Sequence, residues 1–365
     1  MSKNYYIIPI FVPHEGCPHD CVFCNQDKIT GIKKDSLRIV EDRESRKDIY
    51  LSDNENKEIT AEDVKKIVYE YLATINHKNA IVEISFFGGT FTGIKEEKQK
   101  ELLGVAKKFK DAGLIDKIRL STRPDYINEY ILSYLKEYST DIIELGVQSL
   151  NDEVLLKAGR GHNVDDVYKA SKLIKEYGFV LGHQIMPGLP GDDFKTDIET
   201  AKASIDMEPD ICRIYPALTI RGTAMEIMYK RGDYVPYTLK EAVEISKEMY
   251  KMYRARSINV IRIGLQPTET INEKHDVVAG PFHPAFRELV ESSLITELIL
   301  ENMKESEKAE IHINPKDISK LYANKKMYFN ILRDNNKNVN VEQNRDVERG
   351  KIILYLGSKK VDIIY

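Results

Sequence analysis

Three of the chain's four cysteines, Cys17, Cys21 and Cys24, lie in the short segment CPHDCVFC near the start of the sequence. In a reducing compartment, clustered cysteines are more often metal ligands or catalysts than cross-links. A closed zinc site takes four ligands, so these three thiolates would need a fourth ligand from His14 or His19. A [4Fe-4S] cluster held by three thiolates instead leaves one of its irons open.

An open iron can chelate a small molecule that carries neighbouring amino and carboxylate groups, as S-adenosylmethionine (SAM) does. An electron passed to the sulfonium then breaks a carbon–sulfur bond and leaves a 5′-deoxyadenosyl radical. The cofactors carry this chemistry, while the protein binds and orients them and excludes water. The spacing favours a cluster, and a zinc-binding RNA adaptor without catalytic chemistry is the alternative from a different class.

Composition sets the background for this site. The chain has 365 residues, of which 42% are hydrophobic and 31% charged, with a net charge of −4. The chain is long enough to bury a large core, and its negative net charge gives no indication of nucleic-acid binding. Few cysteines, no secretory signal and no bilayer-length apolar run lead us to expect a cytoplasmic protein without membrane contact.

Apolar runs alternate with helix-like stretches along most of the chain, which predicts parallel strands joined by right-handed crossovers. We expect an α/β fold, a partial TIM-like (β/α)6 barrel, with an open doubly wound sheet as the alternative. The predicted division is a barrel over 1–268, a helical connector over 269–307 and a small α+β unit over 308–365. The runs are 5–12, 80–89, 117–122, 141–149, 179–188, 210–218 and 259–267.

Polar and glycine residues follow these runs, at the end of a barrel where active sites lie. Gly88 and Gly89 let backbone approach a ligand closely. Glu144 and Gln148 project to the same side of a strand at period two, and can bond ribose hydroxyls. An ion pair of Glu144 with Arg123 is the structural alternative.

Further candidates come from later strand ends. Arg160 lies between glycines and is suited to gripping a carboxylate. Arg213, Tyr215 and Gln266 lie near predicted strand ends and are candidates for substrate contacts. Cys212, on an apolar run, is expected to be a buried core thiol.

Taken together, the motifs resemble the radical-SAM domain of the Elongator catalytic subunit and its bacterial relatives, over roughly residues 5–230. The resemblance implies that Cys17, Cys21 and Cys24 hold the cluster. The motifs that carry it are CPHDCVFCNQ, FFGGTFTG, STRPD, ELGVQS, RGH, GHQIMPGLPG and RIYPALTIRGT. The expected cofactor contacts are Phe23, Gly88, Gly89, Thr90, Ser121, Thr122, Glu144, Gln148, Arg160 and Gln184.

The family also implies a substrate and a reductant. We expect action on RNA, most simply tRNA, with electrons from a flavodoxin- or ferredoxin-like protein. The family's long acetyltransferase domain has no room before Tyr365, and no second cysteine cluster is visible. The acetyl-transfer half of the family reaction therefore does not carry over. A radical-SAM enzyme acting on a free small molecule, such as a modified nucleotide or a tetrapyrrole precursor, is the same-class alternative.

The last part of the chain has a different pattern. From Glu310 to Tyr365 it carries 11 Lys and Arg against 7 Asp and Glu. Its predicted order, β-α-α-β-β, is that of a KH-type RNA-binding unit, in which a G-x-x-G loop clamps nucleotide backbone. Here Ala323, Asn324, Lys325 and Lys326 take the place of that loop. We expect a degenerate KH-like unit that meets phosphate through these residues, with a packing domain that carries a solvated basic loop as the alternative.

Overall fold

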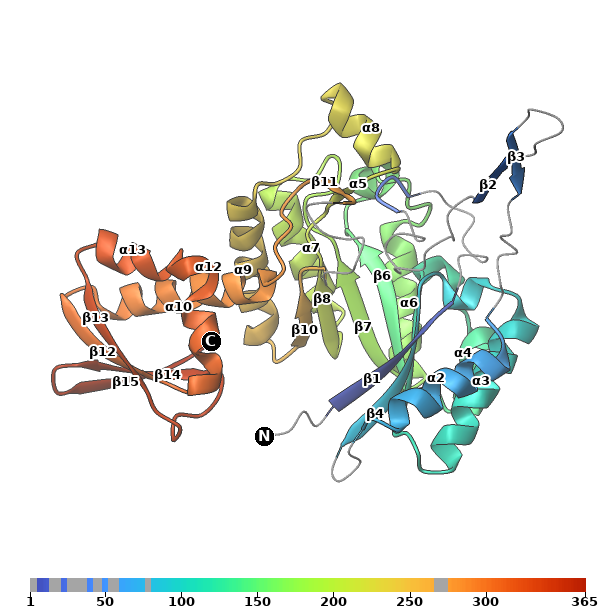
Figure 1. Ribbon diagram of the computed structural model, residues 1–365, viewed down its shortest axis with the longest axis horizontal. Coiled ribbons are helices and arrows are strands. Elements are labelled where there is room, and N and C mark those ends of the chain that lie inside the picture. Colours follow the sequence, from blue (N-terminus) through green and yellow to red (C-terminus); the bar gives the residue numbers. More distant parts are fainter. Residues whose placement is uncertain are drawn as a thin grey trace.

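The computed structural model describes residues 5–12, 21–24, 38–41, 48–51, 59–75, 80–265 and 275–365. Figure 1 shows a curled parallel sheet with helices along one side, and a smaller α+β unit at the C-terminal end of the chain. The predicted ligand Cys17 and the predicted substrate contact Gln266 lie outside the described residues.

The main sheet has seven strands, and every neighbouring pair is parallel. Strand order follows chain order without the reversal that marks a doubly wound sheet, so the partial barrel is confirmed. Each predicted apolar run forms one strand. They are β1 (Tyr5–Phe11), β4 (Ile81–Phe87), β5 (Lys117–Thr122), β6 (Ile142–Gln148), β7 (Val180–Ile185), β8 (Ile211–Ile214) and β10 (Asn259–Ile263).

The two faces of this sheet differ in chemistry. On β4, Val82, Ile84 and Phe86 point into the apolar core, while Glu83 and Ser85 alternate with them on the inner face. Because side chains alternate along a strand, the same sequence builds an apolar outer layer and a polar interior. The covering helices are α2 (Ala61–Leu72), α3 (Glu96–Asp111), α4 (Glu129–Glu137), α6 (Val164–Glu176), α7 (Phe194–Asp206) and α9 (Leu239–Ala255).

The helix ends follow the local sequence. Thr60 and Asp63 form the expected capping box at the start of α2, each side chain bonding the other's backbone N–H. After α3 and α6, Gly113 and Gly178 adopt φ of 69° and 78°, the left-handed conformation of a helix-ending glycine. These signals fix where the helices stop, so the strand ends reach the same edge of the sheet.

Short elements lie between the main ones. Strands β2 (Arg38–Glu41) and β3 (Asp48–Leu51) form an antiparallel pair between β1 and α2. Helices α5 (Asp152–Lys157) and α8 (Ala224–Arg231) follow β6 and β8. Strand β11 (Val277–Ala279), which we did not expect, pairs with β9 (Thr219–Ile220).

Helix α10 (Phe286–Asn302) lies within the segment predicted as a helical connector, between the barrel strands and the tail. It packs on α9 from the barrel and on α11 and α13 from the tail. Leu289, Ile295 and Ile299 on α10 belong to a core cluster that includes residues of both parts. The tail is therefore held to the barrel by a continuous apolar interface.

The tail sheet has strand order β13-β12-β14-β15, with β12 parallel to β13 and the other pairs antiparallel. Strand β15 corrects the expected order, which ended at β14. The turn at Gly357 (φ 61°) reverses the chain. The following strand begins with two lysines, so its sequence lacks the apolar start that would have indicated a strand. The tail elements are β12 (Lys308–Ile313), α11 (Ile318–Leu321), α12 (Ala323–Lys326), α13 (Phe329–Asp334), β13 (Asn338–Gln343), β14 (Lys351–Leu356) and β15 (Lys359–Ile364).

Among the described helices, none combines the length and the apolar character needed to cross a bilayer. The cytoplasmic location stays a prediction.

Candidate active site at the carboxyl ends of the strands

Residues 21–24, the described part of the cysteine segment, form a tight turn next to α5 and α8. Within it, the Cys24 N–H donates to the Cys21 carbonyl at 2.9 Å. The Val22 N–H donates to the Ala158 carbonyl at 3.0 Å, and the Met225 N–H donates to the Val22 carbonyl at 2.8 Å. Hydrogen bonds thus hold Val22 of the turn to the C-terminal end of α5 and to the first turn of α8.

An apolar cluster surrounds this turn. Cys21 and Phe23 are both buried in it, and Cys24 packs against it. Because apolar neighbours exclude water, the sulfur atoms lie in a low-dielectric environment in which charges interact strongly. The other buried members are Val154, Ala158, Leu189, Ala217, Met225 and Tyr234.

Arg160 lies directly beside the cysteine turn and is 6% exposed. Its Nη1 donates to Sγ of Cys21 at 3.4 Å, and its Nη2 donates to the Gly146 carbonyl at 2.6 Å. A Cβ on Gly146 would lie 3.2 Å from Arg160 Nη2, so glycine permits this close approach. A neighbouring guanidinium favours the thiolate form of a cysteine, which is the form that binds metal.

The two predicted glutamines meet at the same edge. Gln184 Nε2 donates to Gln148 Oε1 at 3.3 Å. Gln148 has φ of 67° at an irregularity in the pairing of β6 with β7, where the register shifts after Gly146. Such irregularities re-aim side chains. The amides of Gln148 and Gln184 are thereby brought together.

Glu144 lies deeper in the barrel, 4% exposed, and forms ion pairs with two arginines. Arg119 and Arg213 both bond Oε1, the latter through Nε at 3.0 Å. The ion-pair alternative considered from sequence named the wrong partner, because Arg123 pairs with Asp125 at 2.8 Å.

Arg213 and Tyr215, the two described candidates for substrate contact, bond each other. Arg213 Nη1 donates to the Tyr215 hydroxyl oxygen at 3.0 Å. The Arg213 guanidinium also lies 5.5 Å from the Phe87 ring centre. Arg213 is therefore already engaged by a carboxylate, a hydroxyl and an aromatic ring.

Sequence reasoning missed the residues that anchor this interior. Glu83 accepts bonds from Arg119, Tyr5 and Ser85 and is fully buried. The signal was present: Glu83 and Arg119 are charges inside otherwise apolar strands, which is rare without partners. Only the strand order supplies those partners.

The remaining predicted cofactor contacts lie at two strand ends. Ser121 Oγ approaches Glu144 Oε2 at 3.4 Å, so it shares the inner face. The neighbouring Thr122 bonds the hydroxyl of Thr92 at 2.5 Å, on the other side of β5. Gly88, with φ of 109°, directly follows β4, and Gly89 and the buried Thr90 come next.

A carboxyl pair lies beyond β7, with the half-buried Asp192 in the loop and the buried Asp197 on α7. Asp197 accepts from the Tyr237 hydroxyl at 2.8 Å and from the Gly188 N–H at 3.3 Å. Burial and the neighbouring Asp192 carboxylate raise the pKa of Asp197 well above its usual range. Tyr234, in the cluster around the cysteine turn, donates to the Gly188 carbonyl at 2.7 Å and ties this loop to the site.

Cys212 lies apart from this turn. It is fully buried on β8, and burial raises the pKa of its thiol to about 12. The predicted core thiol is confirmed.

In the tail, the residues expected to form a nucleotide-binding loop fall within the short element α12, whose backbone leaves helical geometry at Asn324 and Lys325 and turns sharply. Asn324, Lys325 and Lys326 have φ of 44°, 55° and 66°, and all three are exposed. Lys326 Nζ lies 4.2 Å from the centre of the Tyr322 ring. Three consecutive left-handed residues other than glycine are costly, so the surrounding helices must impose this turn.

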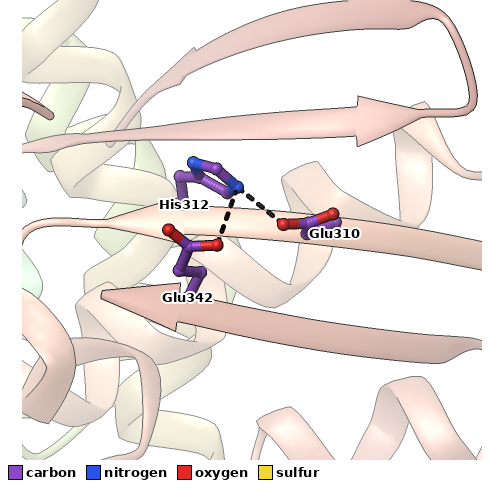
Figure 2. A group of neighbouring side chains, drawn as sticks. All are labelled: Glu310, His312 and Glu342. Atoms are coloured by element: carbon purple, nitrogen blue, oxygen red, sulfur yellow. Dashed lines mark hydrogen bonds and ion pairs between the residues drawn. The ribbon is translucent and has the colours of Figure 1, made fainter. Parts of the chain in front are cut away.

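The open face of the tail sheet has the opposite charge. Figure 2 shows Glu310 and His312 on one strand and Glu342 on its neighbour. His312 Nε2 lies 2.8 Å from a Glu310 oxygen and 3.6 Å from a Glu342 oxygen. Both carboxylates are exposed. Phosphate is repelled from such a surface, so the tail's basic turn and its acidic sheet face differ in what they attract.

Known proteins share this arrangement. Residues 11–203 match the Radical SAM superfamily and residues 209–296 match the Radical_SAM C-terminal domain. Over 260 residues the chain is 31% identical to tRNA uridine(34) acetyltransferase of Methanocaldococcus jannaschii, covering 66% of this chain and 47% of that protein. It is 28% identical over 269 residues to Elongator complex protein 3 of Homo sapiens, covering 64% and 46%.

A solved structure agrees on the fold. Archaeal Methanocaldococcus infernus Elp3 with an N-terminal deletion superposes with a TM-score of 0.57 at 22% identity, covering 83% of this chain and 64% of that chain. The chain spans about half the length, or less, of the curated relatives it matches. Because the family match covers more than half of the sequence, from the first strand to α7, this chain belongs to the radical SAM superfamily.

Proposed function

We propose that this chain binds a [4Fe-4S] cluster through Cys17, Cys21 and Cys24, cleaves SAM and modifies tRNA. The observation that carries the proposal is the buried turn at the barrel mouth, where Arg160 donates to the Cys21 sulfur. The donor set fits the group, because thiolates are its usual ligands and the Arg160 guanidinium donates to the Cys21 sulfur. When bound, the cluster supplies the electron that cleaves SAM.

The chain's own residues define where SAM would lie. Glu144, Gln148 and Gln184 come from neighbouring strands β6 and β7, and Arg160 joins the backbone of β6 at Gly146 to the cysteine turn. Backbone at Gly88 and Gly89 and the side chain of Thr90 follow β4. Their common place at the carboxyl ends of parallel strands supports these residues as cofactor contacts, with Ser121 beside Glu144.

The apolar cover around Phe23 has a second role. Val154, Leu189 and Met225 close over the turn, which keeps water from the sulfur atoms. Exclusion of water protects reactive species from side reactions. A flavodoxin- or ferredoxin-like protein is the proposed electron donor.

tRNA is the proposed substrate because of the relatives' names and the tail. The relatives include proteins named for the acetylation of tRNA uridine 34. We place the RNA backbone against the exposed turn of Asn324, Lys325 and Lys326, away from the acidic face of the tail sheet. In this proposal the tail, 308–365, is a KH-like RNA-binding unit.

A deuterium-transfer experiment tests the substrate. The chain, reconstituted with iron and sulfide under anaerobic conditions, is incubated with SAM, a reductant and tRNA deuterated at its ribose and base carbons. Deuterium in 5′-deoxyadenosine, measured by mass spectrometry, supports tRNA as the hydrogen donor. If cleavage is unaffected by tRNA and no deuterium transfers, while a free nucleotide or tetrapyrrole precursor does exchange, the small-molecule alternative replaces it.

A further inference from the structure

A chain of alternating charges crosses the inner face of the barrel sheet. It runs from Glu83 on β4 through Arg119 on β5 and Glu144 on β6 to Arg213 on β8. Arg119 Nε lies 2.7 Å from Glu83 Oε1, and its Nη2 lies 2.9 Å from Glu83 Oε2. Its Nη1 bonds Glu144 Oε1. Arg119 is therefore the one guanidinium that touches both carboxylates of this chain of charges.

All four side chains are buried, and their charges balance. Glu83 is 0%, Arg119 and Glu144 are each 4%, and Arg213 is 8% exposed. Buried ion pairs contribute little net stability compared with apolar side chains of similar volume, whereas losing one partner is strongly destabilising. Stability alone therefore does not account for this set of buried charges.

The arrangement fixes one oxygen of Glu144. Oε1 accepts from both Arg119 and Arg213. Among the described residues, the partner of Oε2 is the Ser121 hydroxyl at 3.4 Å, at the long end of hydrogen-bond range. Glu144 is thus anchored by one oxygen and presents the other beside Ser121, where a ligand hydroxyl can donate to it.

Glu83 makes Arg119 rigid in turn. Its Oε2 accepts a hydrogen bond from Arg119 Nη2, its Oε1 forms an ion-pair contact with Arg119 Nε, and the Tyr5 and Ser85 hydroxyls bond the same carboxylate. A hydrogen-bonded ion pair between buried groups restricts the orientation of both side chains. The glutamate on β4 therefore orients the arginine on β5, which orients the glutamate on β6.

We propose that Arg119 is a positioning residue, which acts through Glu144 to set the oxygen that receives the hydroxyls of bound SAM. The inference rests on the proposed function, because it takes Glu144 as a contact of SAM. The inference predicts that the effect of Arg119 on SAM affinity can be separated from its effect on folding stability. Arg119 neutralises both Glu83 and Glu144, but only Glu144 would contact SAM.

The test uses the full chain reconstituted with its cluster, and compares Arg119→Gln with the double variant Glu83→Gln/Arg119→Gln. The single variant leaves two buried carboxylates with one guanidinium, and should lose both thermal stability and SAM affinity. The double variant removes the surplus charge, so its melting temperature should recover. Its dissociation constant for SAM, from equilibrium dialysis, should stay about tenfold weaker than wild type, as expected for a lost charge-assisted bond.

Two further variants complete the test. In a Glu144→Gln background, Arg119→Gln should change SAM affinity little, because the two residues act through one oxygen. Lys247→Gln, which breaks a buried pair with Glu297 between α9 and α10, should lower stability and leave SAM affinity unchanged. Recovery of both stability and affinity in the double variant would make Arg119 purely structural and overturn the inference. Failure of the wild-type holoprotein to bind SAM would overturn the proposed function itself.

Discussion

Arg160 and Cys21, far apart in the sequence, meet at 3.4 Å between guanidinium Nη1 and Sγ. The same guanidinium holds the Gly146 carbonyl at 2.6 Å at the end of β6. The cysteine turn is thus joined to the strand that carries Glu144. This contact links the cysteine turn to the edge of the sheet where the candidate site lies.

Replacing Arg160 by Gln should weaken cluster binding. The variant keeps a donor but loses the charge, so we expect iron and sulfide content to fall and SAM cleavage to drop by about tenfold or more. Arg160→Lys, which retains the charge, should keep more cluster than Arg160→Gln. Iron analysis and the yield of 5′-deoxyadenosine measure both effects. Equal cluster content in the two variants would show that the charge is unimportant.

Gly182 makes room for Glu144. A Cβ at Gly182 would lie 2.7 Å from Glu144 Cγ, so Gly182→Ala must displace that side chain. We expect SAM affinity to fall by about tenfold, since a shift of this size misplaces the carboxylate. Gly104→Ala is the matched control: its Cβ would meet Tyr138 at an ordinary 3.6 Å on helix α3. That control should bind SAM normally and gain about 0.5–1 kcal/mol of stability. Normal affinity in Gly182→Ala would contradict the role given to Glu144.

The carboxyl pair formed by Asp192 and the buried Asp197 makes stability depend on pH. Because the pKa of Asp197 is raised to about 10 in the folded chain, the folded state holds a proton that the unfolded state releases. This contribution is fully present below the unfolded pKa, near about 4, and is lost as pH rises toward the folded pKa of Asp197.

Asp197→Asn mimics the protonated acid and should remove this slope. We expect the variant to melt a few °C above wild type at pH 8, with a difference that shrinks toward pH 5, at roughly 2–4 °C for each kcal/mol. Glu199→Gln, on the exposed side of α7, serves as control and should leave the pH profile unchanged. Parallel melting curves for wild type and Asp197→Asn across this range would rule out the shared proton.

The tail turn should govern tRNA affinity. Exchanging both Lys325 and Lys326 for Glu should weaken tRNA binding and flatten its dependence on salt, because fewer counterions are released. The control makes the same charge change at Lys359 and Lys360, which are exposed on β15. The dissociation constant for tRNA, measured at several salt concentrations for both double variants, shows which pair of lysines contacts the RNA. An equal loss in both variants would indicate a general charge effect, and no loss would remove the tail from the RNA interface.

Much of the barrel could be predicted from the sequence because strands and helices have local signatures. The seven apolar runs became seven parallel strands, and Gly113 and Gly178 follow the ends of their helices in the left-handed conformation typical of helix-ending glycines. Arg160 was found from its glycine neighbours, although its contact with the Cys21 sulfur was not.

The interior network could not be predicted, because it depends on pairing between strands. Glu83 and Arg119 each look out of place in their own strand, and only the order β4-β5-β6 brings them to Glu144. The register shift near Gln148 likewise arises from pairing with β7 and not from its local sequence. Local sequence patterns were therefore sufficient to locate the candidate site. Which charged side chains pair with one another inside it depends on contacts between strands that are distant in the sequence.

The central claim is that the turn at Cys21 holds a cluster that cleaves SAM. The most direct measurement is the yield of 5′-deoxyadenosine from anaerobically reconstituted wild type, Cys21→Ala and Cys212→Ala, with iron content measured in parallel. The account predicts about four irons and reductive cleavage for wild type and for Cys212→Ala, and loss of cleavage in Cys21→Ala. A colourless wild-type protein that holds only zinc and forms no 5′-deoxyadenosine would contradict it.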